Sequence, residues 1–157
     1  MRDEAARGGN ASLSPMEAAL GQARAAGERG EVPIGAVIVH GGKIIAAAGN
    51  SPRALSDPTA HAEILAIRAA AQKLGSERLV GCDLWVTLEP CPMCAAAISF
   101  ARIRRLYYGA EDSKGGAVVS GPRLFDQPTC HHAPEVYGGF RETEAAEILR
   151  EFFRARR

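Results

Sequence analysis

Two cysteines stand three residues apart in the apolar segment VTLEPCPMCAAA (residues 86–97). Cys91 and Cys94 could form a disulfide, act as a redox pair or bind a metal ion. Pro92 favours a helix that begins directly after Cys91, and such a helix carries both sulfurs at its tip. The positive end of the helix dipole lowers the pKa of a thiol, which suits a redox pair and a metal site equally. A metal site requires further ligands, whereas a redox pair does not.

A third candidate ligand stands in the segment DPTAHAEILAI (57–67), where Asp57 or Thr59 is expected to cap a helix. This helix would carry His61 in its first turn and Glu63 two residues later. Residues two apart point in nearly opposite directions on the side of a helix, but at its tip a long side chain can reach round the end. His61 could then bind a metal ion while Glu63 contacts a molecule bound to that ion. Alternatively, Glu63 is a solvated acid of the first turn beside a hydrogen-bonded histidine.

Taken together, His61, Cys91 and Cys94 provide three ligands, the number typical of a catalytic zinc site whose fourth position is open to water. Two thiolates would balance the charge of the dication and temper its Lewis acidity, so a nearby base is needed to move protons. A structural zinc site more often has four Cys or His ligands and no use for a carboxylate. The pattern therefore predicts one catalytic Zn²⁺ per chain, with Glu63 as the proton carrier.

The rest of the sequence predicts the elements that must position these residues. Ser14, Pro15 and Glu17 are typical of a helix start with a capping box, and Gly41–Gly42 joins two strands into a hairpin. Strands that alternate with helices from residue 60 onward predict a sheet with parallel members and helices on both faces. The further expected segments are a loop at 50–59, a helix at 60–74, a strand at 82–88, a helix from 92, a strand at 104–110, a long ordered loop at 112–140 that could contain a short turn of helix, and a terminal amphipathic helix at 143–157.

The bulk properties bound the possible classes of protein. The chain has 157 residues, of which 46% are hydrophobic and 24% are charged, with a net charge of +1. We expect one domain at 14–157 after a flexible arm at 1–13. No apolar run approaches the roughly 18 residues that cross a bilayer, and the arm lacks the apolar core of a secretory signal. A cytoplasmic location is therefore expected, and in that reducing compartment a structural disulfide is disfavoured.

The pair of motifs, HAE and PCPMC, resembles the signature of the zinc nucleoside deaminases. Longer blocks are similar to successive segments of the bacterial tRNA adenosine deaminases: VPIGAVIV, DPTAHAEI, TLEPCPMC, YYGAEDSKGG and FFRARR. The resemblance covers residues 14–157. It implies a three-layer α/β/α cytidine-deaminase-like fold, with a mixed central sheet of about five strands and helices on both faces. The short signature is shared with cytidine, cytosine and guanine deaminases, so the longer blocks carry the substrate class.

The resemblance also implies roles for single residues. Zinc would be held by His61, Cys91 and Cys94, and Glu63 would relay protons while an activated water attacks C6 of adenine to leave inosine. The substrate would be the wobble adenosine of a tRNA anticodon stem-loop, where an unstacked nucleotide costs little to extrude. Further substrate contacts would come from Asn50 to the purine and from Asp112 and Lys114 to the nucleotide before the target.

The terminal segment and the oligomeric state are less specific signals. Phe153 stands among Arg150, Arg154, Arg156 and Arg157, a combination that suits stacking and phosphate contacts with single-stranded RNA. Terminal arginines are also commonly just solvated. Related enzymes are dimers with the helices near the zinc at the interface, so a homodimer is expected, although the alanine-rich CAAAISFA fits a core equally well.

Two alternatives remain open from the sequence. Cys130, His131 and His132 could form a second metal site or join Cys91 and Cys94 in a structural zinc site, which would make the chain a non-catalytic RNA-binding module. They could equally belong to a hydrogen-bonded loop. Within the enzymes, the alternative substrate is a free base or nucleoside such as guanine, cytosine or cytidine.

Overall fold

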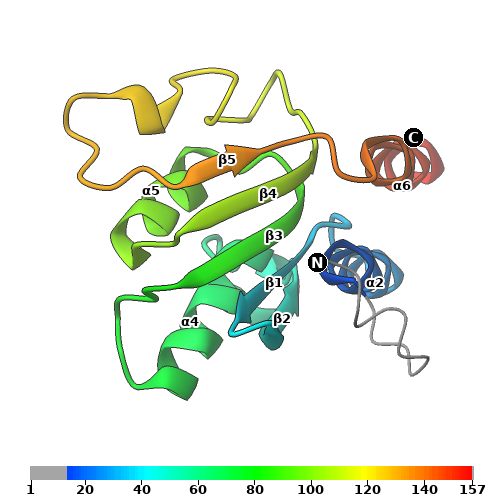
Figure 1. The fold of residues 1–157 in the computed structure, drawn as a ribbon. Helices are drawn as coiled ribbons and strands as arrows, with labels where there is room; N and C mark the ends of the chain where they lie inside the picture. Colours follow the sequence, from blue (N-terminus) through cyan, green and yellow to red (C-terminus); the bar gives the residue numbers. More distant parts are fainter. Residues whose placement is uncertain (1–13, 157) are drawn as a thin grey trace.

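The chain folds around one five-stranded mixed sheet, shown in a computed structural model that describes residues 14–156. The predicted arm at 1–13 lies outside the described residues. The strand order is β2-β1-β3-β4-β5, where β1 pairs antiparallel with β2 and β3, and β3, β4 and β5 run parallel (Figure 1). The bounds are β1 (Gly35–His40), β2 (Lys43–Gly49), β3 (Cys82–Leu88), β4 (Arg105–Ala110) and β5 (Glu135–Tyr137).

The predicted hairpin joins β1 and β2. Gly41 and Gly42 occupy the turn with φ angles of 59° and 78°, a left-handed conformation that glycine adopts without steric cost. Two consecutive positive φ angles are typical of the tight turns whose twist matches paired strands. The turn residues therefore set the register of the pairs next to the turn, and an irregularity between Ile38 and Val39 shifts the pairing over the rest of the hairpin.

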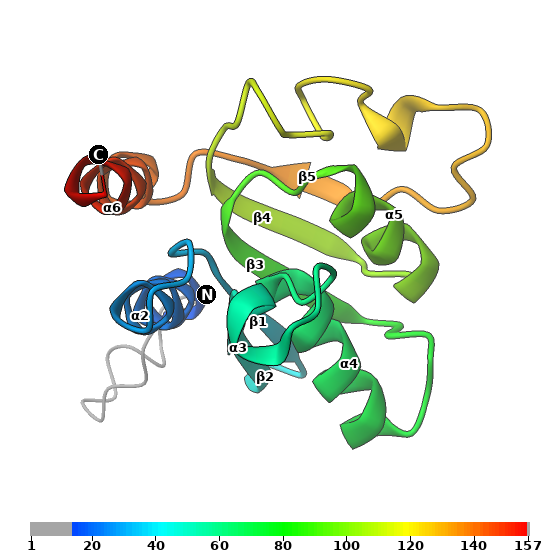
Figure 2. The same ribbon diagram turned by 180° about the vertical axis from the view of Figure 1, so that it is seen from behind.

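Helices cover both faces of the sheet, which confirms the predicted three-layer arrangement. One face carries α2 (Pro15–Glu28) and α6 (Glu142–Ala155), and the other carries α4 (Ala62–Leu74) and α5 (Pro92–Ala101), with the short α3 (Pro52–Leu55) near the start of α4 (Figure 2). The predicted capping box of α2 is present, because Ser14 accepts from the Glu17 amide and Glu17 accepts from the Ser14 amide.

Alternating residues of β1 supply two separate cores. Ile38 belongs to the cluster on the side of α4 and α5, whereas Val37 belongs to the cluster on the side of α2 and α6. Both side chains are fully buried, as the period of two along a strand requires for a sheet covered on both faces. The central strands are therefore packed from both sides, and this packing fixes the points at which the loops leave the sheet.

Three local predictions were wrong. The segment expected to be a loop at 112–140 contains the strand β5, and the loop expected at 50–59 contains the helix α3. The short turn of helix expected within 112–140 is present as the 3-10 turn η1 (Leu124–Asp126). Strand β5 has only three residues and depends on pairing with β4, which no local pattern reveals. Neither Asp57 nor Thr59 caps α4, because Asp57 Oδ1 accepts from the amide and hydroxyl of Thr59 and closes a turn instead.

Candidate active site

Two helix N-termini meet at the candidate site. His61 is the N-cap residue of α4 and Cys91 is the N-cap residue of α5, so His61 lies one position before the first turn in which it was predicted. Pro92 occupies the start of α5, as predicted, and Cys94 follows in the first turn. Neither N-cap side chain caps its own helix. The imidazole and the thiol are therefore free to point between the two helix ends.

The three predicted metal ligands come together there. His61 Nδ1 lies 3.7 Å from Cys91 Sγ and 3.5 Å from Cys94 Sγ, and the three donor atoms all lie within 4.8 Å of one another. In a tetrahedral zinc site with Zn–S of about 2.3 Å and Zn–N of about 2.0 Å, nitrogen and sulfur are about 3.5 Å apart. The donor set and its spacing therefore fit a metal ion of this kind, with Nδ1 as the ligand atom of the histidine.

The electrostatics of the two thiols differ. The pKa of Cys91 falls to about 4, mainly because its sulfur accepts a hydrogen bond from Cys94 and also interacts with His61. The pKa of Cys94 is raised by the same interaction with Cys91 and by burial. Both sulfurs lie at the positive end of α5, which favours negative charge at that position. A divalent cation between them would hold both as thiolates.

Glu63 lies inside the first turn of α4 with only 4% of its surface exposed. Burial raises the pKa of Glu63 to about 7, because the charged form loses its hydration. The solvated first-turn acid that the sequence left open is therefore excluded. A carboxyl group with a pKa near neutrality can both accept and release a proton, which is the property a proton carrier requires.

Asn50 follows the end of β2 and is 5% exposed. Its Oδ1 accepts a 2.8 Å hydrogen bond from the amide of Ala62, the first residue of α4. Asn50 thus supplies the cap that His61 does not. The side chain of His61 is left free to lie beside Cys91 and Cys94, and these three residues together form the metal group. Asn50 Nδ2 makes no hydrogen bond to any other residue that the structure describes, so it remains available as a donor beside the site.

The loop after β4 carries Asp112 and Lys114 next to this site. Asp112 Oδ1 accepts from the amides of Lys114 and Gly115, so one carboxylate oxygen shapes the loop while the other is free of these bonds. Lys114 is exposed. The loop is attached to the metal group through Glu89, whose Oε1 accepts from the amide of Asp112.

Glu89 is a residue of this site that the sequence interpretation missed. It is 2% exposed and accepts four further hydrogen bonds, from the amides of Val118 and Val119 and from the amide and hydroxyl of Ser120. Burial alone would raise its pKa, but these donors together hold the pKa below its usual value. The signal in the sequence was the acid immediately before PCPMC, at a position where the neighbouring residues are apolar.

Phe153 lies apart from the metal group. It belongs to α6, which packs on the opposite face of the sheet from α4 and α5, and it is 46% exposed (Figure 1). Together with Leu149, Arg150 and Arg154 it lines a shallow hollow. Phe152 is only partly exposed and carries Arg156 over its ring at 3.6 Å. The aromatic and basic residues of α6 are therefore a surface feature and not a part of the core.

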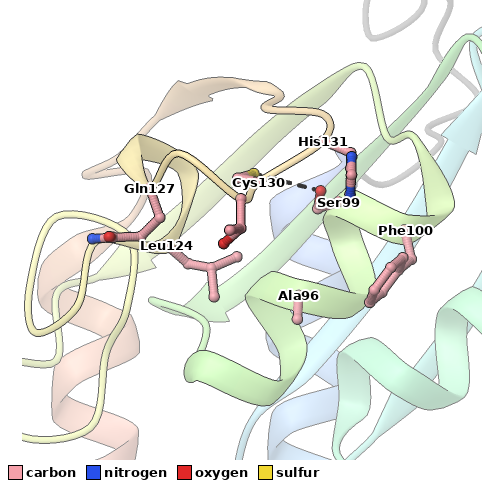
Figure 3. A pocket seen from close by; sticks show the side chains of 8 residues that line it. Ala96, Ser99, Phe100, Leu124, Gln127, Cys130 and His131 are labelled. Atoms are coloured by element: carbon pink, nitrogen blue, oxygen red, sulfur yellow. Dashed lines mark hydrogen bonds between the residues drawn. The ribbon is translucent and has the colours of Figure 1, made fainter.

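Cys130, His131 and His132 do not join the metal group. Cys130 Sγ lies 3.5 Å from Ser99 Oγ (Figure 3) and donates a hydrogen bond to the carbonyl of His132. His132 Nε2 lies 2.7 Å from the carbonyl of Ile103. Among the described residues, only His61, Cys91 and Cys94 form a group that could hold a metal ion. The hypotheses of a second metal site and of a four-ligand structural zinc site were therefore wrong, and the alternative of a hydrogen-bonded loop is confirmed.

Comparison with known proteins identifies the family. A profile of the MafB19-like deaminases matches residues 11–157. The tRNA-specific adenosine deaminase of Agrobacterium fabrum is 70% identical over 142 residues, which are 90% of this chain and 93% of that protein. The chain belongs to the tRNA-specific adenosine deaminase family. The resemblance predicted from HAE, PCPMC and the longer blocks is thereby confirmed.

Solved structures agree with this family and with its fold. A structure from a study of A-to-I editing by tRNA:A34 deaminases at the wobble position of transfer RNA is 70% identical, covers 86% of this chain and 98% of its own, and superimposes with a TM-score of 0.85. The guanine deaminase of Bacillus subtilis is 35% identical, covers 78% and 82% of the two chains and has a TM-score of 0.62. No helix in the described part of this deaminase is both long and apolar enough to span a bilayer.

Replacement of Asn50 tests the cap of α4. Asn50→Ala removes the acceptor of the Ala62 amide, so the free energy of unfolding is expected to fall by about 1–3 kcal/mol. Gln72→Ala is the matched control, because it removes an exposed amide from the same helix and should change stability by no more than about 0.5 kcal/mol. Urea unfolding measures both, and equal stabilities of the two variants would show that Asn50 does not cap α4.

Proposed function

We propose that the chain hydrolyses adenosine to inosine at the wobble position of a tRNA anticodon loop, with one Zn²⁺ held by His61, Cys91 and Cys94. The observation that supports this most is the set of three donor atoms beside a buried carboxylic acid, with nitrogen–sulfur distances of 3.5 and 3.7 Å that fit a tetrahedral zinc site. Three protein donors leave one position for water, as in catalytic zinc sites. The relatives that are most informative for the substrate are the tRNA deaminases of 70% identity.

The metal ion, when bound, supplies the Lewis acidity that activates water. Glu63 accepts a proton from that water and delivers it to N1 of the adenine ring while oxygen adds to C6. The remaining proton then passes through Glu63 to the exocyclic amine, the C6–N6 bond breaks, and ammonia leaves. Adenosine and water thus give inosine and ammonia, with Glu63 returned to its first state.

The protein groups around this centre hold the base and its neighbours. Asn50 donates from Nδ2 to the purine while its Oδ1 keeps the helix capped. Asp112 accepts with its free carboxylate oxygen from a ribose hydroxyl, and Lys114 pairs with a phosphate. Phe153 and Arg154 contact the RNA from α6, where both are exposed. Anticodon loop nucleotides are already unstacked in part, so extrusion of the target costs little.

The proposed compartment is the cytoplasm, because the proposed substrate, tRNA, is abundant there. The four cysteines are all free, as expected in a reducing environment. A disulfide would remove the two thiolates on which the metal group depends.

A second copy of the chain is the proposed partner of α5. Phe100 is 70% exposed on this helix, and it borders a hollow on the side of Cys130 (Figure 3). It also borders a second hollow on the side of Ile67. An exposed aromatic between two hollows can insert into the matching surface of a symmetric partner. The dimer would then bury the outer face of the helix that carries Cys91 and Cys94 at its start.

The proposed activity is tested with an anticodon stem-loop that carries adenosine at the wobble position. The zinc-loaded protein is expected to convert this adenosine to inosine, measured by nucleoside mass spectrometry after digestion. Glu63→Gln should lower the rate by at least about 100-fold, because the proton carrier is lost, while zinc content and melting temperature stay unchanged.

The activity on the stem-loop is compared with the activity on the alternative substrates. Guanine, cytosine and cytidine are offered to the same preparation under the same conditions. Turnover of one of them without any inosine in the stem-loop would contradict the proposed substrate, and full activity of Glu63→Gln would contradict the proposed role of Glu63.

The proposed dimer is tested by molar mass in solution. Phe100→Asp places a charge at the centre of the interface and is expected to convert the dimer to a monomer in light scattering. Phe153→Asp is the matched control, because it changes an exposed phenylalanine on the other side of the sheet and should leave the mass unchanged. An identical mass for wild type and both variants would exclude α5 as the interface.

A further inference from the structure

Glu89 is a buried carboxylate without a cation. It is 2% exposed, and none of its hydrogen-bond partners among the described residues is a lysine or an arginine. Its Oε2 accepts from three consecutive amides, those of Val118, Val119 and Ser120, at 2.9 to 3.0 Å. Such a row of amides is a concave anion site of the backbone. The negative charge is therefore stabilised by the loop itself, and the loop is shaped around the charge.

The other carboxylate oxygen attaches the opposite end of the same loop. Glu89 Oε1 accepts from the Asp112 amide at 2.9 Å and from the Ser120 hydroxyl at 3.0 Å. One side chain thus binds both ends of the segment 112–120. Because Asp112 Oδ1 in turn accepts from the Lys114 amide, the positions of Asp112 and Lys114 follow from the position of Glu89.

Glu89 is also tied to the metal group by the backbone. Only Pro90 separates it from Cys91. The Glu89 amide donates to the carbonyl of Ala110, and the carbonyl of Pro90 accepts from the amide of Ala117. The segment that leads into Cys91 therefore contacts the loop through the side chain of Glu89 and through the backbone of Pro90, and its Glu89 amide is bonded to the end of β4.

Gly116 shows how closely the loop is fitted to this carboxylate. A Cβ atom at this position would lie 2.4 Å from Glu89 Cδ and 2.6 Å from the carbonyl oxygen of Asp112. No side chain fits there without displacing the carboxylate or the backbone. The glycine is required by the close approach of the loop to Glu89.

We propose that Glu89 is the positioning residue that fixes the 112–120 loop relative to the metal group, so that the target base and the nucleotide before it are bound in register. This inference rests on the proposed function, because it assigns the loop to RNA recognition. Glu89 itself touches neither the base nor the metal group. Its effect reaches the substrate through Asp112 and Lys114, so loss of Glu89 should weaken RNA binding more than it slows the chemical step.

Glu89→Gln separates the two ends of the loop. A carboxamide keeps one accepting oxygen, and the three amides at 118–120 favour placing that oxygen at the Oε2 position. The amide nitrogen then faces the donating amide of Asp112, and two donors cannot pair. The variant should therefore release Asp112 and Lys114 while the segment 118–120 stays attached.

The expected result is a rise in KM for the wobble-adenosine stem-loop of about tenfold, with kcat within about threefold of wild type and zinc content unchanged. Amide hydrogen exchange should become faster at Asp112 and Lys114 than at Val118 and Val119. Glu135→Gln is the matched control: it makes the same chemical change at an exposed, hydrogen-bonded carboxylate on β5 and should alter neither KM nor exchange in the loop.

Two outcomes would overturn the proposal. An unchanged KM would show that the loop does not need Glu89, and a fall in kcat at constant KM would show a role in stability or chemistry alone.

If Glu89→Gln does not fold, hydrogen exchange of the wild-type protein still tests the proposal. The amides of Asp112, Val119 and Ser120 must then exchange as slowly as the amide of Ala95 in α5, and rapid exchange of these amides would refute the fixed attachment of the loop to Glu89. Absence of inosine with wild-type protein would instead refute the proposed function, and the exchange measurement would stand independently.

Discussion

The meeting of two helix N-termini is the constraint on which the rest of the site depends. Helices α4 and α5 begin at the same place, and each begins at a residue whose side chain does not cap its own helix. The positive dipole ends of the two helices favour anionic sulfur between them. Were either helix to start one residue earlier or later, His61 or Cys91 would rotate by roughly 100° and leave the group.

The sheet explains why the helices start where they do. Strands β2, β3 and β4 run in the same direction, because β1 is antiparallel to both β2 and β3. Asn50, Cys91 and Asp112 each follow the end of one of these strands, so they emerge at one edge of the sheet. A crevice beyond the carboxyl ends of such strands is the usual place for a ligand in open α/β sheets. The fold thus brings together residues that are far apart in the sequence.

The three candidate metal ligands could be singled out in the sequence, because a metal site requires particular side chains and the chain contains few histidines and cysteines; the structure brings their donor atoms within 4.8 Å of one another. The strands β1 to β4 and most helices could also be predicted, since Pro15, Pro92 and Gly41–Gly42 act locally. What was missed depends on contacts across the fold. Strand β5 forms only because it pairs with β4, and the cap of α4 comes from Asn50, eleven residues before His61 in the chain. No local pattern encodes such hydrogen bonds.

Glu89 shows the same limit at the level of a single side chain. In the sequence it is one acid in an apolar segment, and only the fold reveals that five donors from a distant loop surround it. Cys130 and His132 show the reverse case. Their residue types suggested a metal site, but hydrogen bonds to the backbone and to Ser99 account for both side chains. Residue type alone therefore overestimates metal sites and underestimates structural anions.

In the proposed metal centre, one imidazole and two sulfurs hold the ion and leave a fourth position for water. X-ray absorption spectroscopy of the zinc-loaded protein tests this arrangement most directly. The account predicts two sulfur ligands at about 2.3 Å and two nitrogen or oxygen ligands at about 2.0 Å, with the signature of a single imidazole. A shell of three or four sulfurs, or of two imidazoles with two sulfurs, would mean that the fourth position is filled by protein and would contradict the account.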